Sequence, residues 1–128
     1  MTAQIESIAL DNGLTVINSA VTRIWITANE PTTYALATTG SGTSQALGYK
    51  SFGAGSTFGA PGAGAGTSRA VTSASVTDGT ITTSGTAAWW AACSESSLYA
   101  HGSLASNQAV TAGNSFTLGQ FAITIPNH

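Results

Sequence analysis

Charged residues are scarce in this chain: lysine, arginine, aspartate and glutamate make up 6% of its 128 residues, where an average soluble domain has about 25%. The three cations cannot form the basic surface that binding to nucleic acid requires. The net charge of −2 is spread without runs of one sign, which argues against a polybasic membrane-binding patch. We therefore expect neither nucleic acid nor a membrane among the partners.

Cysteine and long apolar runs are equally rare. The single cysteine, Cys93, excludes an intrachain disulfide and lacks the neighbouring Cys and His residues of a zinc site. No stretch approaches the roughly 18 apolar residues of a membrane span, and the N-terminus lacks the basic segment and apolar run of a Sec signal peptide. These features predict a soluble protein made in the cytoplasm, without a metal or a cofactor.

Small residues are what the chain has in abundance: Ala, Thr, Ser and Gly account for 73 of the 128 positions. The length fits a single domain, residues 1–128, with a thin core that we expect an oligomer or a larger assembly to complete. Within it, residues 53–68 form a low-complexity segment rich in Gly and Ala. One interpretation is a flexible surface loop. The other is an extended arm that orders only against a neighbouring subunit, with Phe58 as its anchor.

The periodicity of apolar residues changes once along the first half of the chain. Near the N-terminus they recur at helical spacing, which predicts a short helix over residues 8–19. After that point the spacing favours strands, at 21–28 and again at 47–52. The remainder of 32–68 is interpreted as connection.

The second half of the chain is rich in turn signals between β-prone segments. Asp78-Gly79 predicts a type I′ turn that joins strands over 69–77 and 80–87 in a hairpin. A second hairpin is expected between 87–94 and 97–105. Ala112-Gly113-Asn114 then marks a turn into the last strand.

The last strand contains a change of parity. Its apolar residues occupy even positions at Phe116 and Leu118 and odd positions from Phe121 onward, which predicts a β-bulge at Gly119-Gln120. Together these elements predict a mainly β fold. We expect an antiparallel β-sandwich or open barrel of about six to seven strands, with one short N-terminal helix.

Residues suited to catalysis are few and scattered. His101 shares a strand face with Tyr99 and Ser103 that we expect to be exposed to solvent, and the other histidine, His128, is the C-terminal residue. No GxSxG motif accompanies the serines, and the carboxylates are not paired in the sequence as glycoside cleavage would require. We therefore predict no catalytic residue and no enzyme activity.

Trp89 and Trp90 are adjacent on one predicted strand, so their side chains point to opposite faces of the sheet. One of them is expected in the core; the other packs under a helix or loop, or forms an interface. A sugar-stacking platform is a third alternative, for which the flanking alanines offer no polar neighbours. Cys93, on the same strand, is expected to act as a small hydrophobic residue. The candidate interface residues are Phe58, Trp89, Trp90 and Tyr99.

Short motifs recur in a fixed order along most of the chain. In the first half they are Leu10-Asp11, Glu30-Pro31-Thr32-Thr33-Tyr34 and Leu47-Gly48; in the second they are Gly85-Thr86-Ala87-Ala88-Trp89-Trp90-Ala91, Gly102-Ser103-Leu104, Gln108-Ala109-Val110, Gly113-Asn114-Ser115-Phe116-Thr117-Leu118 and Phe121-Ala122-Ile123-Thr124-Ile125-Pro126. With these motifs the chain resembles a group of small proteins encoded among the virion structural genes of tailed phages, especially phages of alphaproteobacteria. Members of that group often have a polar residue where Trp89 stands here.

The resemblance implies a virion component, made in the host bacterial cytoplasm, whose partners are the major capsid protein or other virion proteins. The composition supports this independently, because small side chains lose little conformational entropy when a surface becomes ordered. We expect a capsid decoration protein that bridges shell subunits, and a homo-oligomer. The alternatives are a tail or fibre component and a β-module that binds host-surface carbohydrate.

Overall fold

The computed structural model describes residues 7–39, 46–53, 57–63 and 69–125. The elements are, in chain order, α1 (Ser7–Ala20), β1 (Arg23–Thr27), α2 (Tyr34–Thr38), β2 (Ala46–Ser51), β3 (Gly62–Ala63), β4 (Arg69–Thr72), β5 (Val76–Ile81), β6 (Gly85–Cys93), β7 (Leu98–Val110), β8 (Ser115–Leu118) and β9 (Ala122–Ile125). The helix expected over 8–19 and the strands expected at 21–28 and 47–52 are confirmed as α1, β1 and β2, with boundaries shifted by one or two residues.

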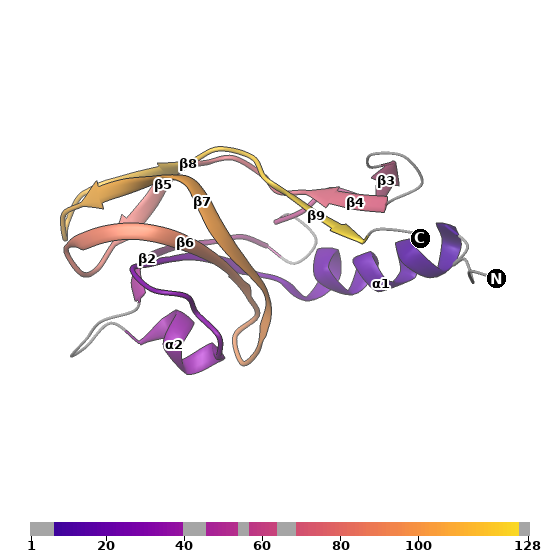
Figure 1. Ribbon diagram of the computed structural model, residues 1–128, viewed down its shortest axis with the longest axis horizontal. Helices are drawn as coiled ribbons and strands as arrows, with labels where there is room; N and C mark the ends of the chain where they lie inside the picture. Colours follow the sequence, from indigo (N-terminus) through magenta and orange to yellow (C-terminus); the bar gives the residue numbers. More distant parts are fainter. Residues whose placement is uncertain (1–6, 40–45, 54–56, 64–68, 126–128) are drawn as a thin grey trace.

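Six strands form one sheet in the order β7-β6-β1-β2-β5-β8, and β3, β4 and β9 form a second sheet. Every described strand pair is antiparallel. The six-stranded sheet curls into a half-barrel, and the smaller sheet lies beside α1 at the other end of the molecule (Figure 1). The predicted fold class, a mainly β antiparallel open barrel with a short N-terminal helix, is confirmed.

A short turn between β7 and β8 joins the two edge strands of the half-barrel. Gly113 has a φ of 90°, and the N–H of Asn114 donates to the carbonyl of Thr111 at 3.0 Å, so the turn expected at 112–114 is confirmed. Near this turn a side-chain hydrogen bond connects the two edge strands: Nε2 of Gln108 on β7 donates to the carbonyl of Thr117 on β8 at 2.9 Å. No backbone ladder joins β7 to β8 among the described residues, so the barrel has an open seam between its two edges.

The hairpin expected around residues 95 and 96 is also confirmed, as β6 and β7. Oγ of Ser94 accepts hydrogen bonds from the backbone N–H groups of Ser96 and Ser97, at 3.2 and 3.1 Å. The N–H of Ser94 donates to the carbonyl of Ser97, which closes the loop. Serine supplies this turn chemistry locally, without a glycine.

The core lies on both faces of the six-stranded sheet. β1 is buried on both sides: Ile24 and Ile26 point into the concave face, and Trp25 points to the convex one. The concave cluster reaches α1 and consists of Leu14, Val21, Ile24, Ile26, Leu47, Phe58, Val71, Val76, Ile81, Ala87, Trp90, Ala92, Phe116 and Leu118. The convex cluster is smaller, with Trp25, Ala37, Ala46, Ala91 and Cys93.

A short helix covers part of the convex face, in a region that the sequence analysis assigned to connection. α2 is capped by Thr33, whose Oγ1 accepts the N–H of Leu36 at 3.1 Å, and Ala37 on α2 is buried against the Trp25 cluster. Five residues give too little periodicity to be recognised, and a helix of this length depends on tertiary packing.

The hairpin predicted at Asp78-Gly79 is wrong. Both residues lie inside β5, where the register against β8 shifts between Val76 and Gly79. The glycine is required for space, because a Cβ on Gly79 would overlap the ring of Phe116. Asp78 forms a 2.9 Å ion pair with Lys50 instead, and this hydrogen-bonded cation lowers the pKa of the Asp78 carboxyl below its usual value.

The parity change in the last predicted strand is real, but its cause is a break and not a bulge. Phe116 and Leu118 are buried in β8, which belongs to the six-stranded sheet. Residues 119–121 then carry the chain across to β9 in the other sheet, where Phe121 and Ile123 pack against the same core from a new direction. Side chains alternate between the two faces along a regular strand, so a change of parity requires an irregular residue. The link between the two sheets supplies this irregularity.

Phe58 corrects the expectation for the segment 53–68. Its side chain is 2% exposed and packs in the core of its own domain, edge-on to Phe121 with ring centroids 5.8 Å apart. The neighbouring Thr57 is fully buried, and its Oγ1 donates to the carbonyl of Val21 at 2.8 Å. Phe58 is therefore no anchor for a neighbouring subunit. Residues 54–56 and 64–68 lie outside the described residues.

Replacing Phe58 with alanine is expected to destabilise the isolated domain by about 3–5 kcal/mol, the usual cost of emptying a buried aromatic site. Chemical denaturation measures the change. The matched control is Tyr99→Ala, which removes an exposed ring and should change stability by no more than about 0.5 kcal/mol. Equal stabilities of Phe58→Ala and the unmodified chain would place the ring outside the domain's own core.

Candidate functional site

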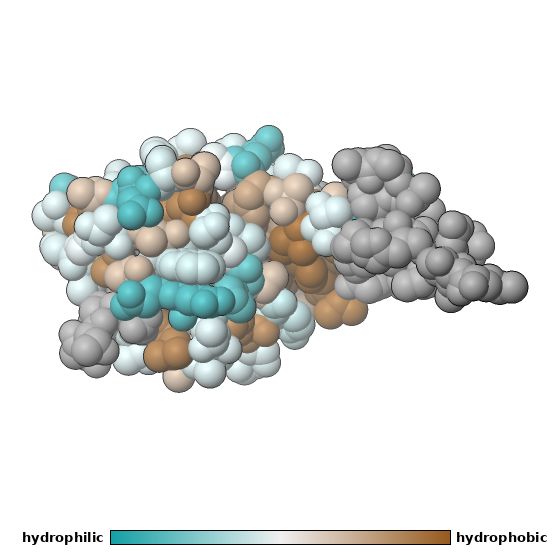
Figure 2. Space-filling model, viewed as in Figure 1, coloured by the Kyte–Doolittle hydropathy of each residue, from teal (hydrophilic) through white to brown (hydrophobic). Residues whose placement is uncertain are grey.

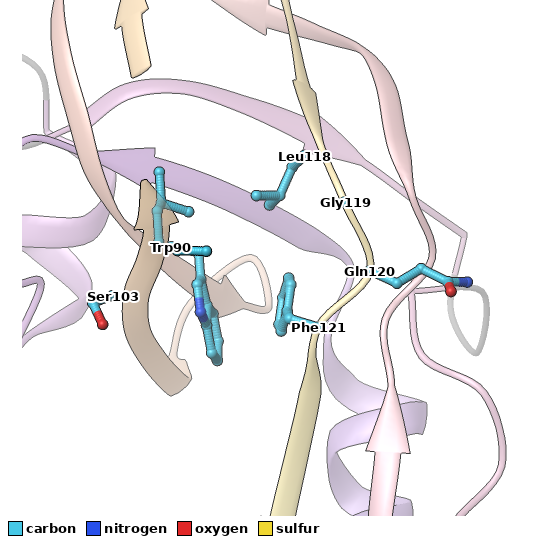
Figure 3. A pocket seen from close by; sticks show the side chains of 8 residues that line it. Trp90, Ser103, Leu118, Gly119, Gln120 and Phe121 are labelled. Atoms are coloured by element: carbon cyan, nitrogen blue, oxygen red, sulfur yellow. The ribbon is translucent and has the colours of Figure 1, made fainter. Parts of the chain in front are cut away.

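A pocket of about 160 Å³ opens at the seam between the two edges of the half-barrel. It lies between β7 and the link from β8 to β9 (Figure 3). The residues that line it are Trp90, Ser103, Leu104, Ala105, Leu118, Gly119, Gln120 and Phe121. In the close-up view the rings of Trp90 and Phe121 stand side by side, while the side chain of Gln120 points away (Figure 3). The pocket is thus mainly apolar.

The aromatic wall of the pocket is fixed by stacking. The rings of Trp90 and Phe121 lie 4.1 Å apart between centroids and are inclined by 25°. Gly102 is the cross-strand partner of Trp90, and a Cβ at this glycine would lie 2.8 Å from Cζ2 of the indole. The absence of a side chain at position 102 lets the indole lie across β7, where it meets Phe121.

Two interruptions in the strands make room for the pocket. On β6 and β7, Ala87 pairs with Gln108 but Trp89 pairs with Ser103, so β7 contains extra residues beside the pocket. On the other side, β8 ends at Leu118 and the chain crosses to β9.

Pockets for whole ligands are usually about 300–1,000 Å³, whereas a cavity of about 150 Å³ holds a single aromatic ring. The size suits one apolar side chain.

A second cluster lies on the convex face of the same two strands. Trp89 is half-buried there, and its ring centroid is 6.4 Å from that of His101, with the planes inclined by 53°. Nε2 of His101 lies 3.2 Å from Oε1 of Glu30. Ser103 is the cross-strand partner of Trp89 and is exposed. The cluster is an aromatic ring bordered by a carboxylate, an imidazole and a hydroxyl.

The structure separates the four residues predicted as interface candidates. Trp90 is buried, 8% exposed, and forms a wall of the pocket, whereas Trp89 lies on the opposite face, so the expectation that one of the two is in the core is confirmed. Tyr99 is 40% exposed on β7. Phe58 is in the core, where it supports the pocket through its contact with Phe121.

Sequence reasoning missed Glu30 and the pocket. Glu30 is 71 positions from His101, and no local pattern links the two. The pocket residues Leu118 and Phe121 were identified by parity, but the space between them depends on how the two sheets meet. As expected, His101 and Ser103 share an exposed face of β7.

The chain offers few charged residues to its surface, with three Lys or Arg and five Asp or Glu in all. The face shown in Figure 2 consists largely of residues of intermediate hydropathy, with strongly polar and strongly apolar residues scattered among them. Within the part of the chain that the structure describes, no group of three or more His, Cys, Asp or Glu side chains could hold a metal ion. None of the described helices is long and apolar enough to cross a membrane.

Comparisons of this chain with protein families, with curated proteins and with solved structures find no match.

Cys93 lies in the convex cluster and is fully buried. Burial raises the pKa of its thiol to about 12, from an ordinary value of 9.0. The unfolded chain loses the Cys93 proton at lower pH than the folded chain. The contribution of the protonated thiol to the free energy of unfolding is therefore complete below about pH 9 and is lost as the pH rises toward 12.

We expect iodoacetamide to alkylate Cys93 in the native protein at pH 8 far more slowly than in the urea-unfolded chain, because the thiolate is the nucleophile. As the pH rises from 9 to 12, the free energy of unfolding should fall less in the Cys93→Ala variant than in the unmodified chain. Mass spectrometry follows the alkylation and denaturant titration follows the stability. Rapid alkylation under native conditions would contradict the burial of the thiol.

Proposed function

We propose that this chain is a structural protein of a tailed-phage virion, and specifically a capsid decoration protein that bridges shell subunits. The resemblance of its ordered motifs to small phage virion proteins supports this assignment. So does a surface of small uncharged residues, which is ordered at low entropic cost when a shell assembles. The proposal assigns the chain a binding role without a catalytic step.

The observation that carries an assembly role is the open seam. Among the described strands, β7 and β8 each have a hydrogen-bonded neighbour on one side only, and such edges pair readily with a segment of another chain. The 13 residues of β7 include no Lys, Arg, Asp, Glu or Pro, the residues that commonly protect an edge strand. The irregular stretch beside the pocket interrupts this edge without adding charge.

The pocket gives the seam a means of selecting its partner. In strand addition, backbone hydrogen bonds supply affinity and pockets for individual side chains supply specificity. An extended segment of a shell subunit, lying along the seam, would place one apolar side chain between Leu104, Leu118 and the stacked rings of Trp90 and Phe121. Burying a side chain of that size contributes about 1.5–3 kcal/mol.

A copy number in the hundreds is expected in purified particles of the phage that encodes this chain, because a decoration protein repeats over the whole shell. Quantitative mass spectrometry of intact virions, with the major capsid protein as internal standard, measures it. A count corresponding to a single ring or trimer would reject the decoration role and favour a tail or fibre component.

Ala105→Lys is expected to weaken attachment of the chain to particles, because it places a charge at the lining of the pocket. The control is Ala109→Lys, on the same strand and equally exposed but outside the pocket. Rebinding of each purified variant to particles lacking the protein, measured by co-sedimentation, should show a loss of about tenfold or more in affinity for Ala105→Lys, equivalent to about 1.4 kcal/mol. Equal binding of the two variants would exclude the pocket from the attachment.

A further inference from the structure

Three side chains on the convex surface, those of Trp89, His101 and Glu30, form a group separate from the buried convex cluster of Trp25. Trp89, His101 and Glu30 come from β6, β7 and the connection between β1 and α2, and they meet on the face opposite the pocket. The side chains of His101 and Glu30 are 31% and 51% exposed, so solvent reaches both. The pocket and its partner use none of these three side chains.

From this arrangement we propose that the convex face is a binding site for a neutral oligosaccharide. A hexose with equatorial hydroxyls has a flat face of C–H groups, and the electron-rich face of an indole attracts such groups. Trp89 supplies this surface, and the ring of His101, inclined to it by 53°, forms a side wall. The two ring centroids lie 6.4 Å apart, so both rings can contact one sugar unit.

Polar groups near the two rings match the hydroxyls at the rim of a sugar ring. The Glu30 carboxylate accepts hydrogen bonds, the hydroxyl of Ser103 both donates and accepts, and the imidazole of His101 can do either according to its tautomer. Ser103 lies directly opposite Trp89 in the ladder, where Cβ atoms are about 4.5–5.5 Å apart. Ser103 and His101 lie beside the Trp89 ring on β7, and Glu30 joins the cluster from the β1–α2 connection through its contact with His101.

Charge decides which sugars are suitable. Glu30 is the acidic group of this cluster, and its described partner is His101, which is uncharged unless protonated. A sugar acid would place a second carboxylate beside Glu30, and like charges at this distance repel. The site therefore favours neutral hexoses or N-acetylhexosamines.

This inference goes beyond the proposed virion role and does not depend on it, because its central residues, Trp89, His101 and Glu30, are not among those that line the seam pocket. Cellotetraose and chitotetraose are suitable neutral probes, and tetragalacturonate is the anionic control. Binding to the full chain is measured by calorimetry and by the ¹H–¹⁵N signal of the Trp89 indole. We expect both neutral probes to shift the Trp89 signal, and tetragalacturonate to leave it unchanged.

Three variants test the assignment of the side chains. Trp89→Ala should weaken binding at least tenfold, Trp89→Phe should weaken it less, and Glu30→Gln should weaken it severalfold while remaining folded. Val16→Ala is the control, because Val16 is 51% exposed on α1, at the end of the molecule that carries the smaller sheet (Figure 1), and it should bind as the unmodified chain does.

The proposal is overturned if neither neutral probe shifts the Trp89 signal, if tetragalacturonate binds as well as they do, or if Glu30→Gln and Trp89→Phe both bind with unchanged affinity. Circular dichroism of each variant confirms that it is folded. The copy number per virion is measured on other material, so a failure of the virion assignment would not be mistaken for a failure of this one.

Discussion

The stack of Trp90 on Phe121 is the contact that joins the two parts of this molecule. Trp90 belongs to the six-stranded sheet, and Phe121 lies on the link that leads into the smaller sheet. Phe58 meets Phe121 edge-on, so three rings form one continuous aromatic column through the domain. Aromatic side chains bury large apolar areas, and these three rings belong to the same core cluster as Leu14 of α1 and Val71 of β4.

The same column explains several local features. Gly102 leaves room for the indole to lie across β7, and the break after Leu118 brings Phe121 to the indole. These two adjustments also leave the space that becomes the seam pocket. The candidate binding site is thus a direct consequence of how a thin core is assembled from small residues and a few rings.

The domain presents two surfaces of different chemistry on opposite faces of one hairpin. On the concave side, the seam offers unpaired strand edges and an apolar pocket, which suits a protein segment. On the convex side, Trp89 is bordered by Glu30 and His101, which suits a polar ligand with an apolar face. Under the proposed function, one face would attach the domain to a particle and the other would stay available for binding.

Local patterns in the sequence determined the elements whose formation depends on neighbouring residues. Helical spacing determined α1, alternation placed Trp89 and Trp90 on opposite faces, and the parity change located the break after β8. The two confirmed turns depend on Gly113 and on the serines around residue 95, which act within a few positions.

Tertiary packing decided everything that required residues far apart to meet. Asp78-Gly79 has the chemistry of a turn, yet the ring of Phe116 needs the space at Gly79, and the pair lies inside a strand. Phe58 stands in a segment that cannot order itself locally, but Phe121 provides its contact. Glu30 reaches His101 only because β1 lies beside β6, and β6 beside β7. Spacing along a chain records local geometry, whereas these contacts depend on which strands become neighbours, and the free energy of burying the shared core selects that order.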